Sequence, residues 1–220
     1  MKDSISHRGK ALNLLKNRLT EPKILVFGGT FDPPHKAHVQ MVAAAAQLIN
    51  PEKVLIIPTA TPPHKEREGI SDAAHRMEMC RLAFKGIPNA EISDMEITRG
   101  GKSYTVDTLT ALAEEYPDRE LVLLCGGDMF ATLDKWVRWQ DIIKLATVAG
   151  VYRPDYISEY DAAMKRLCDK GARIEMIPFE LTEISSTEIR QSIAKGAEIG
   201  DKVSKEVEEY IKENRLYGEN

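Results

Sequence analysis

Two histidines three residues apart, His35 and His38, lie in the segment 28–38, which reads GGTFDPPHKAH. Residues at this spacing share one face of a helix, so both imidazoles can face one ligand. The free N–H groups and the dipole at a helix N-terminus attract anions, and two imidazole donors there suit a polyphosphate. A metal-binding pair and two incidental histidines are the alternatives, although no third metal ligand is evident.

The same segment begins with a glycine pair, and a second pair, Gly126 and Gly127, follows the apolar run 121–125. Glycine allows a tight turn and lets a ligand approach the backbone closely. The segment 28–38 contains neither GxGxxG nor Gly-Lys-Ser/Thr, which excludes the dinucleotide fingerprint and the Walker A loop. Each pair alone is explained by turn formation, whereas two pairs at equivalent strand ends indicate a ligand crevice.

A third segment, 184–190, reads ISSTEIR. Ser185 and Glu188 have the spacing of a helix capping box. Such a cap does not require Ser186, Thr187 or Arg190, whose hydroxyls and guanidinium suit a second anion-binding helix start. Taken alone, the segment is explained by the structure of a helix start.

A fourth segment, 61–65, reads TPPHK and follows the apolar run 54–57. It places His64 and Lys65 on a proline-stiffened loop, where their charge would attract a negative ligand. Taken alone, this loop is explained as a solvated turn.

The elements that must position these residues alternate along the chain. Short apolar runs predict buried strands, and helical periodicity predicts the segments between them. The expected strands are 23–27, 54–57, 90–92, 121–125, 147–151 and 174–177, and the expected helices are 38–49, 71–85, 103–116, 157–170, 186–195 and 204–214. This order predicts an α/β fold, a Rossmann-like doubly wound parallel sheet with short C-terminal helices, which binds ligands at the carboxyl ends of its strands.

The composition is that of an ordinary globular protein, with 220 residues, 43% hydrophobic residues and a net charge of −4. No apolar run approaches the about 18 residues of a membrane span. Three widely spaced cysteines argue against a disulfide scaffold and favour a cytoplasmic location. The acidic balance argues against a nucleic-acid partner. We expect neither a nucleic-acid nor a membrane partner.

We expect two parts: a basic N-terminal extension over residues 1–22, helical or disordered, and a single domain over 23–220. Residues 1–23 contain six basic and two acidic residues, giving +4. Leucines at helical spacing make the extension amphipathic, so a transit peptide or a surface-binding helix is the alternative to a helix packed on the domain.

Segments 28–38 and 184–190 resemble the (T/H)xGH and ISSTxxR signatures of the nucleotidyltransferase superfamily. Segments 62–65 (PPHK), 103–109 (SYTVDTL) and 126–128 (GGD), together with Trp136, look like those of bacterial nicotinate-nucleotide adenylyltransferases. The resemblance covers about residues 23–218. It departs from the family at Ala37 and Asp155, where glycine is usual.

The resemblance implies an enzyme of NAD biosynthesis. It would transfer AMP from ATP to nicotinate mononucleotide by direct in-line attack on the α-phosphate, forming deamido-NAD and pyrophosphate. His38, His35 and Arg190 would be catalytic. No protein ligand for a metal is expected, because the ATP phosphates and water would hold Mg²⁺.

The resemblance also implies the residues that would contact each substrate. The ATP site would comprise Gly28, Gly29, Thr30, Phe31, His35, His38, Gly126, Asp128, Ser186, Thr187 and Arg190. The nicotinate mononucleotide site would comprise His64, Lys65, Thr105, Trp136 and Arg153. There the backbone of Thr105 would receive the nicotinate carboxylate and Trp136 would stack on the pyridine ring, with a role in the core as the alternative for Trp136.

The nearest alternatives are adenylyltransferases that use nicotinamide mononucleotide or phosphopantetheine. The phosphopantetheine enzymes usually have Thr in place of His35, which counts against them. A non-catalytic nucleotide-binding module and a metal-dependent hydrolase are more distant alternatives. The sequence leaves homo-oligomerisation open.

Overall fold

The computed structural model describes residues 22–62, 70–151, 157–178 and 184–218. Its centre is a six-stranded parallel sheet in the order β3-β2-β1-β4-β5-β6. The strands are β1 (Lys23–Gly29), β2 (Lys53–Pro58), β3 (Ala90–Ile92), β4 (Glu120–Cys125), β5 (Ala146–Val151) and β6 (Ile174–Ile177). All six agree with the predicted strands to within two residues at each end, so the doubly wound α/β prediction is confirmed.

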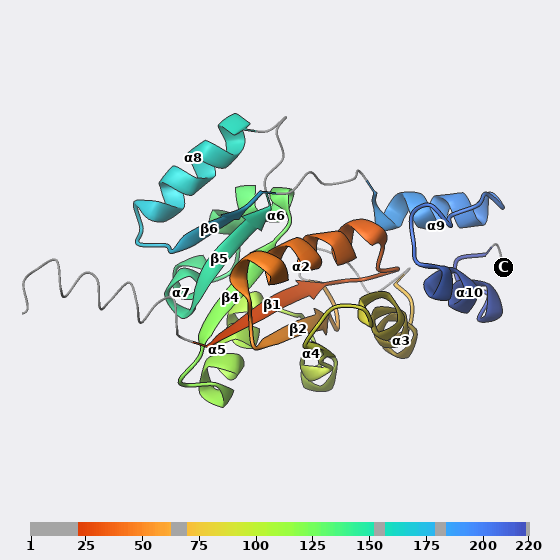
Figure 1. The fold of residues 1–220 in the computed structure, drawn as a ribbon, viewed down its shortest axis with the longest axis horizontal. Helices are drawn as coiled ribbons and strands as arrows, with labels where there is room; N and C mark the ends of the chain where they lie inside the picture. The colour runs from red at the N-terminus through yellow and green to blue at the C-terminus, as the bar shows by residue number, and fades with distance from the viewer. Residues whose placement is uncertain (1–21, 63–69, 152–156, 179–183, 219–220) are drawn as a thin grey trace, which may run out of the picture.

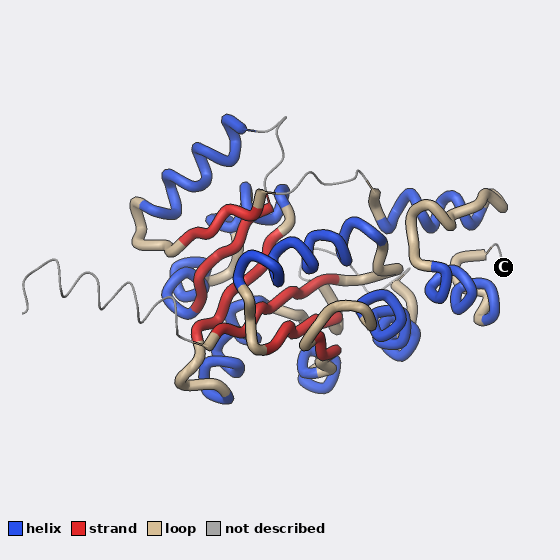
Figure 2. The backbone as a smooth tube through the Cα atoms, in the orientation of Figure 1, coloured by secondary structure: helices blue, strands red, loops and turns tan. Residues whose placement is uncertain are grey.

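Helices cover both faces of the sheet, as Figure 2 shows in blue around the red strands. They are α2 (Lys36–Ile49), α3 (Ala73–Phe84), α4 (Met95–Arg99), α5 (Thr105–Glu115), α6 (Gly127–Ala131), α7 (Trp139–Leu145), α8 (Ile157–Cys168), α9 (Ser186–Ala194) and α10 (Lys205–Glu213), with a 3₁₀ turn η1 (Leu133–Lys135). The helices α9 and α10 lie beyond the arrowhead end of β1 (Figure 1). None of the helices in the described segments is long and apolar enough to cross a membrane.

Successive residues of a strand point to opposite faces of the sheet, so each strand contributes side chains to two hydrophobic cores. Ile24 and Val26 of β1 pack with α5, α6, α7 and α8 on one face. Leu25 and Phe27 pack with α2 and α3 on the other. A third apolar cluster joins α3 to α9 and α10, which fixes the C-terminal helices beside the sheet.

The predicted helices agree with the observed ones to within two residues at each end, with differences at the starts of α2, α3 and α5. The helix expected from residue 103 begins at Thr105, because Ser103 bridges to the segment after β2: its Oγ accepts a hydrogen bond from Ala60 N–H, and its N–H donates to Thr61 O, each at 2.9 Å. The short helices α4, α6 and α7 were not expected, since five to seven residues are too few to establish a helical period.

The strand order reverses between β1 and β4, which are neighbours in the sheet and run to the same edge. Crossovers leave β1 and β4 in opposite directions across the sheet, and in such sheets ligands bind at the carboxyl ends of the strands at this point. Gly28 and Gly29 end β1, and Gly126 follows β4 directly. The two glycine pairs of the sequence therefore lie together at the switch point of the sheet.

Candidate functional site

The two histidines lie at the first turn of α2, directly after the loop that follows β1. His35 is the N-cap residue, and its carbonyl accepts hydrogen bonds from His38 N–H at 3.0 Å and Val39 N–H at 3.3 Å. The two imidazole rings are stacked, with 3.6 Å between centroids and 21° between planes. His35 is only 6% exposed, whereas His38 is half-buried. The spacing of three thus brings both rings to one side of the helix start.

A hydrogen bond between the two histidines indicates which ring nitrogen of His38 carries the proton. The His35 backbone N–H donates to His38 Nδ1 at 3.2 Å. A neutral imidazole that accepts at Nδ1 carries its proton on Nε2, so Nε2–H remains a donor. Burial lowers the pKa of His35 to about 4, and burial followed by the charge of His35 lowers the pKa of His38. Both rings are therefore neutral hydrogen-bonding groups near pH 7.

The segment 184–190 packs directly against the loop that carries the histidines. The Ser186 hydroxyl donates to Pro33 O at 2.8 Å, and Arg190 Nη1 donates to Asp32 O at 2.7 Å. Arg190 Nη2 also donates to Thr187 Oγ1 at 3.4 Å. Two segments more than 150 positions apart thus form one face, with an arginine and a hydroxyl beside the start of α2.

Helix α9 begins where it does because Ser185 caps it. The Ser185 Oγ accepts a hydrogen bond from Glu188 N–H at 3.1 Å. The expected return bond from the Glu188 side chain is not formed in the described segment 184–218, so the predicted capping box is present only in half. Ile189 is fully buried in the cluster with α3 and α10, which holds the helix start against the loop.

The two glycines of each pair have different surroundings. A Cβ on Gly28 would meet nothing closer than Ile57 O at 3.9 Å, and a Cβ on Gly126 would meet nothing within 4 Å. A Cβ on Gly29 would approach the Phe31 ring to 2.8 Å, and one on Gly127 would overlap the Tyr160 hydroxyl. The first glycine of each pair therefore borders open space, whereas packing explains the second.

The other residues expected at the ATP site lie around the same turns. Thr30 is half-buried, and Phe31 is buried among Phe27, Phe84 and the His38 ring. Asp128 is exposed in the first turn of α6. The Phe31 side chain therefore supports the His38 ring from the core, while the Asp128 carboxylate faces solvent.

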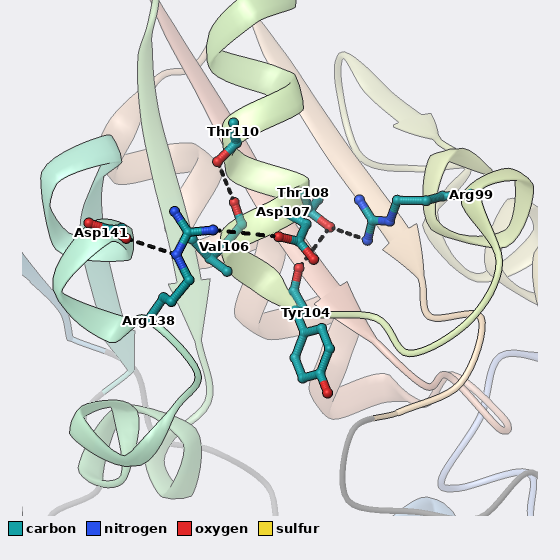
Figure 3. Close-up of polar contacts among 8 residues, drawn as sticks. All are labelled: Arg99, Tyr104, Val106, Asp107, Thr108, Thr110, Arg138 and Asp141. Carbon is teal, nitrogen blue, oxygen red and sulfur yellow. Dashed lines mark hydrogen bonds and ion pairs between the residues drawn. The ribbon is translucent and has the colours of Figure 1, made fainter.

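Helix α5 and the turn before α7 contain Thr105 and Trp136, two of the residues predicted to bind the acceptor. Thr105 is the first residue of α5, so its N–H has no acceptor within the helix. Arg138 lies between the two helices, as Figure 3 shows, with Nε 2.9 Å from Asp141 Oδ2 and Nη1 4.0 Å from Asp107 Oδ1. This arrangement ties the turn that contains Trp136 to the start of α5.

A buried polar network holds the same helix start from the other side. Thr108 Oγ1 donates to Glu96 Oε1 at 2.5 Å. Arg99 Nη2 lies 3.1 Å from Thr108 Oγ1, as Figure 3 shows. Glu96 is 4% exposed and Thr108 is 3% exposed. Because a buried carboxylate requires donors, this network fixes α4 against the first turn of α5.

The two tryptophans have similar surroundings. Trp136 and Trp139 are both half-buried and pack against the core of the α5 face. The structure therefore does not separate a stacking role from a core role for Trp136. His64, Lys65, Arg153 and the departure at Asp155 lie outside the described residues. Within the described segments, no group of three His, Cys, Asp or Glu side chains is arranged to hold a metal ion.

Three residues of this region were not singled out from the sequence. Arg76, only 2% exposed, donates from Nη1 to Thr30 O at 2.9 Å. Asp32 is also 2% exposed, and Tyr217 donates to its Oδ1 at 2.7 Å. An arginine among the apolar residues of α3 is a signal that could have been noticed, whereas nothing in the sequence connects Tyr217 to Asp32.

Comparisons with known proteins identify the family of the chain. The family model described as Cytidylyltransferase-like matches residues 26–192. A curated protein of Listeria welshimeri named "Probable nicotinate-nucleotide adenylyltransferase" is 41% identical over 198 residues, covering 89% of this chain and 97% of that protein. A protein of the same name from Citrifermentans bemidjiense is 39% identical over 209 residues, covering 87% of this chain and 96% of its own length.

Among solved structures, nicotinic acid mononucleotide adenylyltransferase of Plasmodium falciparum has a TM-score of 0.74 with this chain. The alignment is 20% identical and covers 89% of this chain and 97% of that chain. This likeness supports the fold, and the sequence identity to the curated relatives defines the family. The chain belongs to the nicotinate-nucleotide adenylyltransferase family, within the cytidylyltransferase-like proteins.

Proposed function

We propose that this protein transfers AMP from ATP to nicotinate mononucleotide, forming deamido-NAD and pyrophosphate. The observation that carries the proposal is the direct contact between two anion-binding segments at the switch point of the sheet, through Ser186 to Pro33 and Arg190 to Asp32. The names of the relatives at about 40% identity support the choice of substrates.

The reaction needs no covalent enzyme intermediate. A phosphate oxygen of nicotinate mononucleotide forms a bond to the α-phosphorus of ATP while the bond from that phosphorus to the leaving pyrophosphate breaks. The protein has to align the two phosphates and stabilise the negative charge on the oxygens. Its contribution is therefore a set of fixed donors around the triphosphate.

His38 is the donor that we place at the reacting phosphate. Its Nδ1 is occupied by the His35 N–H, which orients the ring and directs the Nε2 proton to a ligand. Because the ring is neutral and already oriented, little reorganisation is needed as charge develops. His35, stacked on His38, would contact the phosphates beside it.

Arg190 is the charged group that we assign to the β- and γ-phosphates. In the structure its Nη1 is bound to Asp32 O and its Nη2 to Thr187 Oγ1. A guanidinium has five N–H donors, so several remain for phosphate oxygens. Ser186 and Thr187 would support this site at the start of α9.

The acceptor would bind on the α5 side of the crevice. The free N–H groups at Thr105 suit the nicotinate carboxylate, and Trp136 offers an aromatic face for the pyridine ring. His64, Lys65 and Arg153 are proposed near the mononucleotide phosphate. This arrangement places donor and acceptor on the two sides of the switch point.

We propose that Mg²⁺ enters the site with ATP, because Mg²⁺ commonly keeps waters and substrate phosphates as ligands. When bound, Mg²⁺ would neutralise part of the triphosphate charge.

Product analysis tests the proposal. The purified full chain is incubated with ATP, Mg²⁺ and nicotinate mononucleotide, and products are separated and identified by mass. We expect deamido-NAD and pyrophosphate in equal amounts, and neither when the acceptor is omitted. ATP breakdown that does not depend on the acceptor, without deamido-NAD, would contradict the assignment.

A further inference from the structure

The loop that carries His35 contains a buried carboxylate held by donors from distant parts of the chain. Asp32 is 2% exposed. Its Oδ1 accepts a hydrogen bond from the Tyr217 hydroxyl at 2.7 Å, and its Oδ2 accepts one from the Ser71 N–H at 3.3 Å. A buried carboxylate depends on such donors, because it has lost its hydration. Tyr217 supplies the shorter of these two bonds.

Tyr217 reaches Asp32 through an unusual backbone course after α10. Arg215 and Tyr217 have φ values of 51° and 64°, in the left-handed region that non-glycine residues rarely adopt. Such a conformation persists where surrounding contacts hold it. The Leu216 N–H donates to Ile211 O at 3.0 Å, and the Tyr217 hydroxyl also lies 3.9 Å from the Met79 sulfur. The chain thus turns back and directs the phenol toward the loop.

The Tyr217 hydroxyl is suited to be a permanent donor. Burial, and after it the negative charge of Asp32, raises the pKa of Tyr217, so the phenol keeps its proton at any physiological pH. Its proton therefore remains available for the Asp32 carboxylate.

We propose that Tyr217 is a positioning residue, which acts through Asp32 to hold the phosphate-binding loop 28–38 in the geometry that ATP requires. The inference rests on the proposed function, because that function assigns ATP to this loop. Three other side chains hold the backbone of the loop: Arg76 at Thr30 O, Arg190 at Asp32 O and Ser186 at Pro33 O. Tyr217 differs from them, since it holds the side chain of Asp32.

Loss of the hydroxyl would leave Asp32 Oδ1 buried without this donor. The carboxylate would move to find solvent or another donor, and the movement would pass through Pro33 and Pro34 to His35, the N-cap of α2. The acceptor side of the site is held separately, by Glu96 and Arg138 around α5. Loss of the Tyr217 hydroxyl should therefore weaken the binding of ATP and leave the binding of the acceptor unchanged.

The test compares Tyr217→Phe with Tyr210→Phe. Tyr210 is a matched control from the same C-terminal region, because its hydroxyl is hydrogen-bonded to His75 Nδ1 at 2.9 Å. We expect Tyr217→Phe to lower kcat/KM for ATP roughly tenfold, as for loss of a hydrogen bond to a charged group. KM for nicotinate mononucleotide should stay within about twofold in both variants, and Tyr210→Phe should leave both parameters unchanged.

A purely structural role predicts a different pattern. It would lower the thermal midpoint and the amount of active protein while leaving KM for ATP unchanged, and that result would overturn the proposal. Action through Asp32 is tested in the Asp32→Ala background, where Tyr217→Phe should have almost no further effect on ATP binding. Independent, additive effects of the two substitutions would also overturn it.

Calorimetric binding of ATP with Mg²⁺, measured without any acceptor, separates this inference from the proposed function. Weaker ATP binding by Tyr217→Phe supports the inference whichever acceptor the enzyme uses. If the wild-type chain binds ATP but forms no deamido-NAD, and Tyr217→Phe binds ATP more weakly, the proposed function fails and the role of Tyr217 stands. If the wild-type chain forms deamido-NAD while Tyr217→Phe binds ATP normally, the inference fails alone.

Discussion

Single side chains in this site combine burial with hydrogen-bonding capacity. The stacked pair of His35 and His38 is desolvated, which favours the neutral form of both rings. A neutral ring still donates through one nitrogen, and the His35 N–H decides that this nitrogen is Nε2 of His38. The electrostatic role of the pair is therefore that of oriented dipoles, with full positive charge supplied by Arg190.

The first prediction concerns His38. His38→Ala removes the oriented Nε2 donor, so we expect kcat to fall by about 10²–10³-fold or more, as for loss of one preorganised donor. Steady-state pyrophosphate release measures this. His75→Ala is the control, because His75 contacts Tyr210 away from the loop and should keep wild-type kcat. Unchanged turnover in a folded His38→Ala protein would remove His38 from the mechanism.

The second prediction concerns the pH dependence of stability. The folded protein holds the pKa of His35 at about 4, below the ordinary 6.5. Above pH 6.5 both folded and unfolded His35 are neutral; between 6.5 and 4 the unfolded state binds more protons, so stability falls as pH falls. His38 shifts in the same direction.

Urea unfolding at several pH values measures this effect. Between pH 6.5 and 4, the free energy of unfolding of the wild-type protein should fall by on the order of 3 kcal/mol because of His35. Solvent that reaches the His35 ring in the folded protein would reduce this change. The free energy of unfolding of His35→Asn should fall by less over this range. Equal losses in the two proteins would contradict a neutral, buried His35.

At the scale of elements, the site depends on where four helices begin. Helices α2 and α6 follow β1 and β4, the start of α9 contacts the loop before α2 through Ser186, and the segment before α5 is bonded to the segment after β2 through Ser103. The start of α9 is fixed by a hydrogen-bonded cap and by a buried isoleucine. The position of each first turn therefore matters more to the site than the length of the helix.

The third prediction concerns the cap of α9. Ser185→Ala removes the Oγ that accepts from Glu188 N–H and should destabilise the protein by about 1 kcal/mol. Because Arg190 lies one turn later, KM for ATP should also rise. Ser204→Ala removes the equivalent cap of α10, where Ser204 Oγ accepts from Val207 N–H, and should lower stability alone. The same KM for ATP in all three proteins would contradict a link between this cap and the site.

Elements buried on both faces were predictable, and elements fixed by distant contacts were not. The four inner strands β1, β2, β4 and β5 are buried and mostly apolar, because helices cover both faces of the sheet, and such runs are recognisable locally. The start of α5 was placed two residues too early because Ser103 resembles a cap, whereas it bonds to the loop after β2. The contact of Tyr217 with Asp32 joins residues 185 positions apart and has no local pattern.

At the scale of the whole molecule, an acidic protein carries a site for anionic ligands. The net charge is −4, and residues 1–23 contribute +4, so the rest of the chain carries −8. We therefore propose that polyphosphate binding depends on local groups, namely helix starts, the histidine pair and Arg190. The site residues that the structure describes begin at Gly28, in the part of the chain that the relatives share.

The fourth prediction concerns residues 1–20. A chain that starts at Glu21 retains β1, which begins at Lys23, and every residue assigned to the two substrates. We expect kcat and both KM values within about twofold of the full chain, because each assigned contact is kept. Steady-state assays of both proteins at matched ionic strength check this. A large loss of activity in a folded, truncated chain would give the extension a catalytic role.

The central claim is that this site selects nicotinate mononucleotide as the acceptor of AMP. The most direct measurement is pyrophosphate release with ATP and Mg²⁺, comparing kcat/KM for nicotinate mononucleotide, nicotinamide mononucleotide and phosphopantetheine. The free N–H groups at Thr105 suit a carboxylate, so we expect nicotinate mononucleotide to be favoured over the amide by roughly tenfold or more. Equal use of the acid and the amide, or preference for phosphopantetheine, would contradict the account.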